Sequence, residues 1–173
     1  MITNKTIINA IALRCLEAHH YEAVKKIYNL GIVTGHATFQ TEAPTWEQWD
    51  ESHLKTCRLA AVDQHEIIVG WAALTPVSGR CVYSGVAEVS VYVHPDHQGK
   101  GVGKKILQEL IHESEKHNLW TLQAGIFPEN IASLKIHKAL GFRKVGYREK
   151  IGKMKGIWRD TILLERRSEL VGV

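Results

Sequence analysis

Residues 87–103 read AEVSVYVHPDHQGKGVG, and they carry the strongest structural signal in the sequence. From Val89 to Val93 every second residue is valine, and Glu88 is the only acid among the first seven residues. A period of two is typical of a β-strand, because successive side chains of a strand point to opposite faces. The pattern therefore predicts a strand that carries one carboxylate on an otherwise apolar element.

The strand runs into a Gln98-x-x-Gly101-x-Gly103 turn and then into an amphipathic helix that we predict from Gly101 to about His117. Gly99, Gly101 and Gly103 allow positive φ and a close approach of the backbone to a ligand. The N-terminus of a helix adds unpaired N–H groups and the positive end of its dipole. We therefore expect the turn to bind a diphosphate group.

Other elements are predicted from apolar periodicity, capping residues and turn signals. They are a strand at 6–17, a helix at 20–29 closed by Gly31, a helix after Pro44 with Thr45 near its N-cap, a hairpin at 58–74 with its turn at 63–66, a loop at 76–84, a strand at 119–126, a helix at 130–140 stopped by Gly141, and two strands around Gly152 to Gly156. This order of elements indicates an α/β fold in which helices cover a sheet.

Composition limits the architecture and the partners. A chain of 173 residues with 45% hydrophobic content suits one core, so we expect a single domain over 1–173, with 1–6 as a flexible leader. The formal charge of +4 is small and the basic residues form no run of five or six, which disfavours nucleic acid as a partner. The sequence contains no apolar run of 18 residues, so we expect no membrane span.

Cysteine and histidine patterns bear on location and metal binding. Cys15, Cys57 and Cys81 are odd in number and lack CxxC spacing, which indicates a reducing compartment rather than a disulfide framework. The ten histidines form no recognised ligand set. We therefore expect a cytoplasmic protein that binds no metal.

Four features together identify a family: the strand that ends in VYV, the QxxGxG turn, the segment 130–142 (NIASLKIHKALGF), and their order along the chain. With them the chain resembles the GNAT superfamily of N-acetyltransferases, which use acetyl-CoA. The segments ATFQTEAPTWEQW, GRCVYSGVAEVSVYV and GIWRD are similar to the branch that acetylates phosphinothricin and methionine sulfoximine. The resemblance implies a mixed, mostly antiparallel central sheet, splayed at the cofactor site and flanked by helices. It also implies acetyl-CoA as cosubstrate, a small amine as acceptor, and a homodimer.

The resemblance also carries over to cofactor contacts. The main chain of the strand is expected to pair with the pantetheine arm as an added strand would. The turn and the helix that begins at Asn130 are expected to meet the rest of the cofactor. The predicted cofactor-binding residues are Val91, Tyr92, Val93, Gln98, Gly99, Lys100, Gly101, Val102, Gly103, Lys104, Asn130 and Ser133. Each has a structural alternative, such as a core valine, an ordinary helix entry, or a simple cap by Asn130.

Glu88 and His137 are the predicted catalytic residues. An ammonium acceptor must lose a proton before its nitrogen attacks a thioester, and Glu88 is placed to take that proton directly or through water. The resemblance puts His137 where many relatives have a tyrosine, so its imidazole either donates a proton to the sulfur or relays one from the amine. The alternatives are an ion-paired Glu88 and a structural His137.

Phe39, Arg80, Tyr83 and Glu88 are the predicted acceptor-binding residues. Arg80 suits a substrate carboxylate because a guanidinium binds a carboxylate through two parallel hydrogen bonds. The alternative is an exposed loop arginine.

Two other functions stay open at this point. One is acetylation of a different amine, such as a protein N-terminus, a polyamine or an aminoglycoside. The other is a CoA-binding sensor without chemistry, which would need neither Glu88 nor His137.

Overall fold

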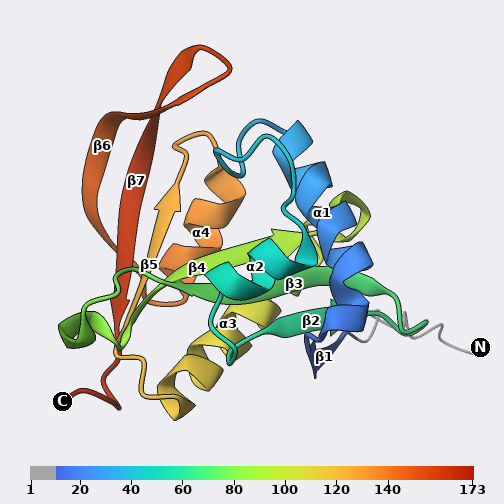
Figure 1. Ribbon diagram of the computed structural model, residues 1–173, viewed down its shortest axis with the longest axis horizontal. Helices are drawn as coiled ribbons and strands as arrows, with labels where there is room; N and C mark the ends of the chain where they lie inside the picture. The colour runs from blue at the N-terminus through green and yellow to red at the C-terminus, as the bar shows by residue number, and fades with distance from the viewer. Residues whose placement is uncertain (1–10) are drawn as a thin grey trace, which may run out of the picture.

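A computed structural model describes residues 11–173, which form one seven-stranded sheet in the order β1-β2-β3-β4-β5-β7-β6 (Figure 1). The strands are β1 (Ala12–Cys15), β2 (Leu59–Val62), β3 (Ile68–Pro76), β4 (Val86–Val93), β5 (Thr121–Ile126), β6 (Arg143–Met154) and β7 (Ile157–Arg167). The α-helices are α1 (Tyr21–Val33), α2 (Trp46–Ser52), α3 (Val102–Lys116) and α4 (Ile131–Ala139). The mixed, mostly antiparallel sheet flanked by helices is thus confirmed.

The pairing of β4 with β5 breaks the antiparallel pattern. Within the described residues it is the one parallel pair, and it holds over three residue pairs, from Val86–Thr121 to Glu88–Gln123. Beyond Glu88 the two strands separate, and β5 continues along β7 as far as Ile126. The sheet therefore splits at Glu88, as the splayed sheet predicted from the sequence requires.

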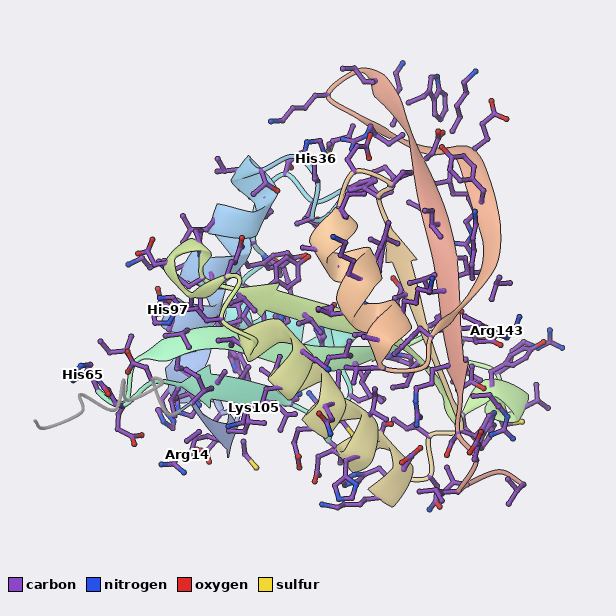
Figure 2. The ribbon with its side chains drawn as sticks, turned by 180° about the vertical axis from the view of Figure 1, so that it is seen from behind. Arg14, His36, His65, His97, Lys105 and Arg143 are labelled. Atoms are coloured by element: carbon purple, nitrogen blue, oxygen red, sulfur yellow. The ribbon has the colours of Figure 1, made fainter. Side chains whose placement is uncertain are left out.

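Each face of the sheet has its own apolar core. On one face α3 buries Ile106, Leu107 and Leu110 against β2 to β5, and α4 packs beside it. Figure 2 views this side, where Lys105 of α3 donates a hydrogen bond to the carbonyl of Ile11. On the other face α1 and α2 lie over the sheet (Figure 1), and their buried side chains pack with Trp71 of β3. Helical stripes of apolar residues thus lie on the sheet, as the sequence pattern indicated.

The start of α2 follows its sequence signal. Thr45 is the N-cap residue, its side chain accepts a hydrogen bond from the Gln48 N–H, and the Gln48 side chain accepts one from the Thr45 N–H. This reciprocal arrangement is a capping box, which satisfies two N–H groups at the helix start. The predicted position of the helix after Pro44 is confirmed.

The prediction that Gly31 closes a helix was wrong. Gly31 lies inside α1, where a Cβ would lie 2.9 Å from the Tyr92 ring. The two strands predicted around Gly152 to Gly156 are observed as β6 and β7, with the turn at Lys155 and Gly156, both at positive φ, while Gly152 lies inside β6 against the Phe39 ring. At Gly31 and Gly152 the missing side chain makes room for an aromatic ring. A single sequence does not show whether a glycine serves a turn or a close contact of this kind.

The predicted strand at 6–17 is observed as β1, and its first part, residues 6–10, lies outside the described residues, as does the predicted leader at 1–6. The loop predicted at 76–84 contains the last residue of β3 and a short 3-10 helix, Cys81–Tyr83. Among residues 11–173, no helix is long and apolar enough to cross a membrane.

Candidate functional site

The inner edge of β4 exposes main-chain groups where the sheet splits. The His94 N–H donates to Val69 O and the Val77 N–H to Val86 O, so the even-numbered residues of β4 turn their polar groups toward β3. Because these groups alternate along an antiparallel ladder, the N–H and C=O of Val91 and Val93 face the opposite side. That side has no β5 partner beyond Glu88. The N–H groups of Val91 and Val93 and the C=O of Val91 therefore face an extended ligand arm without a strand partner, while the Val93 carbonyl accepts a hydrogen bond from the Gln98 side chain.

The turn after β4 forms a cradle with space above its glycines. Gly99 and Gly101 have φ of +71° and +82°, and an added Cβ would meet nothing within 4 Å at either position. Gly101 is the N-cap residue of α3, whose first turn carries no acidic side chain. The cradle thus leaves the N–H groups of the helix start open to an anion.

The prediction of positive φ at Gly103 was wrong. Gly103 lies inside α3, where its Cβ would lie 3.3 Å from Ile136 of α4. Its small size therefore lets the two helices approach. Of the other predicted turn residues, Gln98 donates to the carbonyl of Val93 at 3.2 Å, Val102 packs in the core, and Lys100 and Lys104 are exposed.

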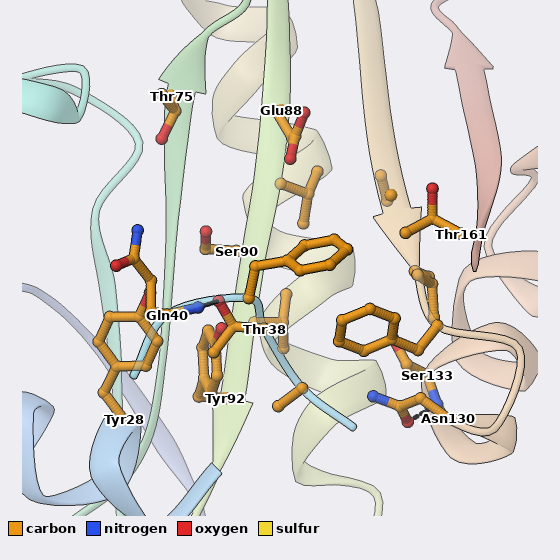
Figure 3. A pocket seen from close by; sticks show the side chains of 18 of the residues that line it. Tyr28, Thr38, Gln40, Thr75, Glu88, Ser90, Tyr92, Asn130, Ser133 and Thr161 are labelled. Carbon is orange, nitrogen blue, oxygen red and sulfur yellow. Dashed lines mark hydrogen bonds between the residues drawn. The ribbon is translucent and has the colours of Figure 1, made fainter. Parts of the chain in front are cut away.

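A cavity of about 630 Å³ lies at the split, between the loop before α2 and the strands β3, β4, β5 and β7 (Figure 3). It is lined mostly by polar and aromatic side chains. They include Tyr28, Thr38, Phe39, Gln40, Gln48, Ser52, His53, Thr75, Glu88, Ser90, Tyr92, Phe127, Asn130, Ser133, His137 and Thr161. The structure thus brings Glu88, His137, Phe39, Asn130 and Ser133 to one place.

Glu88 is the one carboxylate in this lining, which holds no lysine or arginine among the described residues. Its side chain is exposed and points into the cavity (Figure 3), and it accepts a hydrogen bond of 3.2 Å from the Gln123 amide. A lone carboxylate in a cavity without lysine or arginine attracts a cationic group. The lining therefore suits an ammonium ligand.

His137 is buried, with 3% of its surface exposed. Its Nδ1 lies 2.8 Å from the Ser133 carbonyl oxygen, which can only accept, so Nδ1 carries a proton. Nε2 is buried without a hydrogen-bond partner in the described chain. Burial lowers the pKa of His137, although the bond to Ser133 opposes this change. At neutral pH the ring is thus uncharged, and its Nε2 accepts a proton rather than donating one.

Asn130 caps α4, as one of its two predicted roles requires. Its Oδ1 accepts a hydrogen bond from the Ser133 N–H at 3.1 Å, and its Nδ2 donates to the His36 carbonyl at 3.2 Å. Both halves of the amide are therefore engaged within the chain, and the side chain joins α4 to the loop before α2. Its cofactor contact stays a prediction.

The predicted acceptor-binding residues separate into two groups. Phe39 lines the cavity and packs on Phe127, with ring centroids 4.8 Å apart. Arg80 and Tyr83 are exposed in the loop between β3 and β4, with the Arg80 guanidinium 5.9 Å from the Tyr83 ring centroid, and neither lines the cavity. Within one chain, the structure does not bring Arg80 to Glu88.

Sequence reasoning missed several residues of this site. His53 and Thr75 line the cavity, and Arg159 of β7 holds the loop that bears Phe39. Thr75 could have been found from the hairpin register opposite Glu88, but His53 and Arg159 carried no motif.

Comparisons with known proteins agree with this geometry. Residues 21–142 match the model of the acetyltransferase (GNAT) family. YwnH of Bacillus subtilis (strain 168) is 34% identical over 160 residues, covering 90% of this chain and 98% of that protein. The L-amino acid N-acyltransferase MnaT of Escherichia coli (strain K12) is 31% identical over 147 residues, covering 83% and 86%.

Among solved structures, a phosphinothricin acetyltransferase from Sinorhizobium meliloti in complex with acetyl-CoA superposes with a TM-score of 0.84 at 25% identity, covering 94% of this chain and 90% of that one.

Proposed function

Because this chain belongs to the GNAT family of acetyltransferases, we propose that it transfers the acetyl group of acetyl-CoA to the primary amine of a small amino acid or amino-acid analogue. The acceptors we propose are of the phosphinothricin or methionine sulfoximine type. One observation carries the proposal: the cavity at the split of the sheet is lined by a single carboxylate, Glu88, beside the unpaired edge of β4. An ammonium acceptor and an extended acyl donor meet at that point.

The residues present fit acetyl-CoA. Val91 and Val93 offer main-chain partners to the amides of the pantetheine arm. Gly99, Gly101 and the first N–H groups of α3 make the cradle for the diphosphate, with Lys100 and Lys104 close by. When bound, acetyl-CoA supplies the thioester carbonyl that the amine attacks. The contacts of Gln98, Val102, Gly103, Asn130, Ser133 and Tyr92 with it belong to the same proposal.

We assign Glu88 to the ammonium group. Its carboxylate binds the charged amine of the acceptor in the cavity and assists the loss of a proton, directly or through water.

We propose that His137 carries the proton that must reach the CoA sulfur. Because Nδ1–H is held by Ser133 O and Nε2 is free, His137 suits a relay that first accepts a proton and then passes it on.

The carboxylate of an amino-acid acceptor needs a cation that the cavity of one chain lacks. Arg80 is exposed and free of ion pairs within the described chain, and we propose that it meets this carboxylate in a homodimer. Exposed apolar side chains on the hairpin of β6 and β7, such as Tyr147 and Trp158, support such an assembly.

We also propose that residues 1–173 form one domain of a cytoplasmic protein, in keeping with three free cysteines.

The experiment is release of CoA thiol from acetyl-CoA by the purified protein with methionine sulfoximine or phosphinothricin as acceptor. Thiol release that depends on the acceptor, with acetylated product in the mass spectrum, supports the proposal. Binding of CoA without turnover on any amine would instead favour a CoA-binding sensor.

A further inference from the structure

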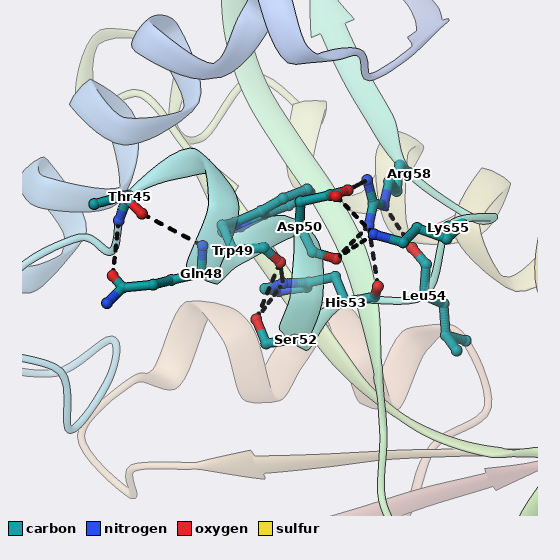
Figure 4. A network of polar contacts seen from close by, with 9 residues as sticks. All are labelled: Thr45, Gln48, Trp49, Asp50, Ser52, His53, Leu54, Lys55 and Arg58. Atoms are coloured by element: carbon teal, nitrogen blue, oxygen red, sulfur yellow. Dashed lines mark hydrogen bonds and ion pairs between the residues drawn. The ribbon is translucent and has the colours of Figure 1, made fainter.

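His53 follows α2 and lies with its ring stacked on Trp49, at a centroid distance of 4.2 Å (Figure 4). Its Nδ1 lies 2.7 Å from the Trp49 carbonyl oxygen and 3.0 Å from the Ser52 hydroxyl. A carbonyl only accepts, so Nδ1 carries a proton and the lone pair of the neutral ring resides on Nε2. Within residues 11–173 the hydrogen bonds of the His53 ring are made by Nδ1, and Nε2 makes none. The fold thus fixes one tautomer and leaves a free basic nitrogen.

The strand register places His53 and Glu88 on the same face of the sheet. Trp71 and Thr75 of β3 lie opposite Tyr92 and Glu88 of β4, and alternate residues share a face. The ring centroids of His53 and Trp71 lie 6.4 Å apart in a T-shaped arrangement, and the Leu54 N–H donates to Leu74 O at 2.8 Å, which ties the segment to β3. Both His53 and Glu88 line the one cavity.

The proposed reaction must move two protons from the acceptor nitrogen. The ammonium R–NH3⁺ becomes the amide R–NH–COCH3, a C–N bond forms as the C–S bond breaks, one proton ends on the CoA sulfur, and the other leaves. His137 suits the first of these protons. The proton that must leave before attack needs a second base, and an imidazole is intrinsically a stronger base than a carboxylate.

We propose that His53 is a catalytic residue whose Nε2 takes the proton from the acceptor ammonium that Glu88 holds by its charge. This inference rests on the proposed function and refines it: Glu88 binds the ammonium group of the acceptor, and His53 removes its proton. Glu88 is exposed and its carboxylate attracts the acceptor, whereas His53 is neutral and fixed in orientation by Trp49 O.

The surroundings of His53 suit a base at neutral pH. Burial lowers its pKa below the usual value of 6.5, opposed in part by the bond to Trp49 O. The charged groups around it are Asp50 on α2 and Arg58 before β2, with Glu88 across the cavity. The imidazole of His137 and the phenols of Tyr28 and Tyr92 complete the titratable groups of the same lining. Arg58 donates to the His53 carbonyl at 3.0 Å and disfavours a second positive charge there.

The test is the pH dependence of kcat/KM for the best acceptor in a screen of amino acids, polyamines and N-terminal peptides. In the wild type, kcat/KM falls as pH drops through the pKa of His53, below 6.5. In His53→Gln, kcat/KM at pH 7 falls about 10²-fold, and the loss shrinks as pH approaches the pKa of the amine itself, because solvent then removes the proton. Affinity for CoA, measured by calorimetry, stays unchanged.

His117→Gln is the matched control. His117 follows α3 and its Nδ1 bonds the carbonyl four residues earlier, Glu113 O at 2.9 Å, but it lies outside the cavity. The His117→Gln variant should keep kcat/KM within about threefold of the wild-type value at every pH, as surface substitutions usually do.

A loss in His53→Gln that is equal at all pH values, or no loss at all, would overturn the role of His53. If His53→Gln does not fold, as judged by its melting curve, His53→Asn replaces it with the same criteria. A best acceptor that is not an amino acid would contradict the proposed acceptor class, while the pH profiles still decide the role of His53.

Discussion

Glu88 and His137 line the same cavity in opposite electrostatic settings. Glu88 is exposed and hydrogen-bonded to Gln123, while His137 is buried beside Phe142, with ring centroids 4.9 Å apart. An exposed carboxylate keeps its charge and attracts an ammonium group, whereas a buried imidazole avoids a permanent charge. The sequence motif was enough to predict both residues as catalytic candidates. The burial and the tautomer of His137 could not be predicted, because they depend on how α4 packs against the residues that follow it.

Glu88→Gln should lower kcat about 10²-fold or more while the affinity for CoA stays the same, because the amide can neither hold the ammonium by charge nor assist its deprotonation. Steady-state kinetics and CoA calorimetry measure the two quantities. Glu113→Gln, which removes the half-buried ion-pair partner of Lys116 on α3, outside the cavity, is the control and should leave both quantities unchanged. Near-normal kcat in Glu88→Gln would assign Glu88 a structural role.

Gly101→Val should weaken CoA binding at least about tenfold, or ~1.4 kcal/mol, because valine strains a backbone at φ +82° and crowds the cradle. Gly156→Val is a matched control, since Gly156 has the same φ of +82° and open space but lies in the turn between β6 and β7. Calorimetry with CoA compares the two variants. Equal CoA affinity in the two would show that the turn before α3 does not bind the diphosphate.

The segment from Thr34 to Pro44 crosses the cavity as a strap between α1 and α2. Arg159 of β7 holds it, since its guanidinium donates to the Gly35 carbonyl at 2.8 Å, contacts His36 Nδ1 at 3.2 Å and bonds Glu129 at 3.2 Å. The guanidinium also lies 4.3 Å from the centroid of the Phe127 ring. The Arg159 guanidinium thus joins β7, the strap and the segment between β5 and α4, which together form one wall of the cavity.

Arg159→Lys should raise KM for the acceptor about tenfold with little change in CoA affinity, because one ammonium cannot make all of these contacts and the strap loosens. Arg143→Lys is the control: Arg143 forms a similar pair with Glu165 at 2.7 Å, on β6 and outside the cavity. Separate titrations of acceptor and acetyl-CoA give the two KM values. Parallel increases of both, or no increase, would contradict a role of the strap at the acceptor end.

Local signals in the sequence predicted most elements, including the capped α2, the hairpin of β2 and β3, and the end of α4 at Gly141, where φ is +88°. The failures have one physical cause. Gly31 faces Tyr92 and Gly103 faces Ile136 from distant parts of the chain, and Arg159 reaches Gly35 across 124 positions. Such long-range contacts leave no periodic or motif signal in a single sequence.

The molecule as a whole exposes apolar side chains at the hairpin of β6 and β7, which rises beyond the rest of the sheet in Figure 1. Tyr147, Ile151, Ile157 and Trp158 are each at least half exposed there. A cluster of this kind is typical of a protein–protein contact. Together with a cavity that lacks its own cation, it is the reason to expect two chains per active unit.

Trp158→Glu should therefore convert a dimer into a monomer of 19.5 kDa, because a charge in an apolar contact is costly to bury. Light scattering after size-exclusion chromatography gives the mass of each. Ile67→Glu, at an exposed apolar position in the turn between β2 and β3, should leave the mass unchanged. A wild type that already has the mass of one chain would contradict the homodimer.

Acetylation of a small amino acid at its α-amine is tested most directly by a ratio of two kcat/KM values, that for methionine sulfoximine over that for its decarboxylated amine. We expect a ratio of at least about 30, since the guanidinium of Arg80, placed at the cavity by the proposed homodimer and left without its carboxylate, costs roughly 2–4 kcal/mol. A ratio at or below one would contradict the account and assign the enzyme to an amine without a carboxylate.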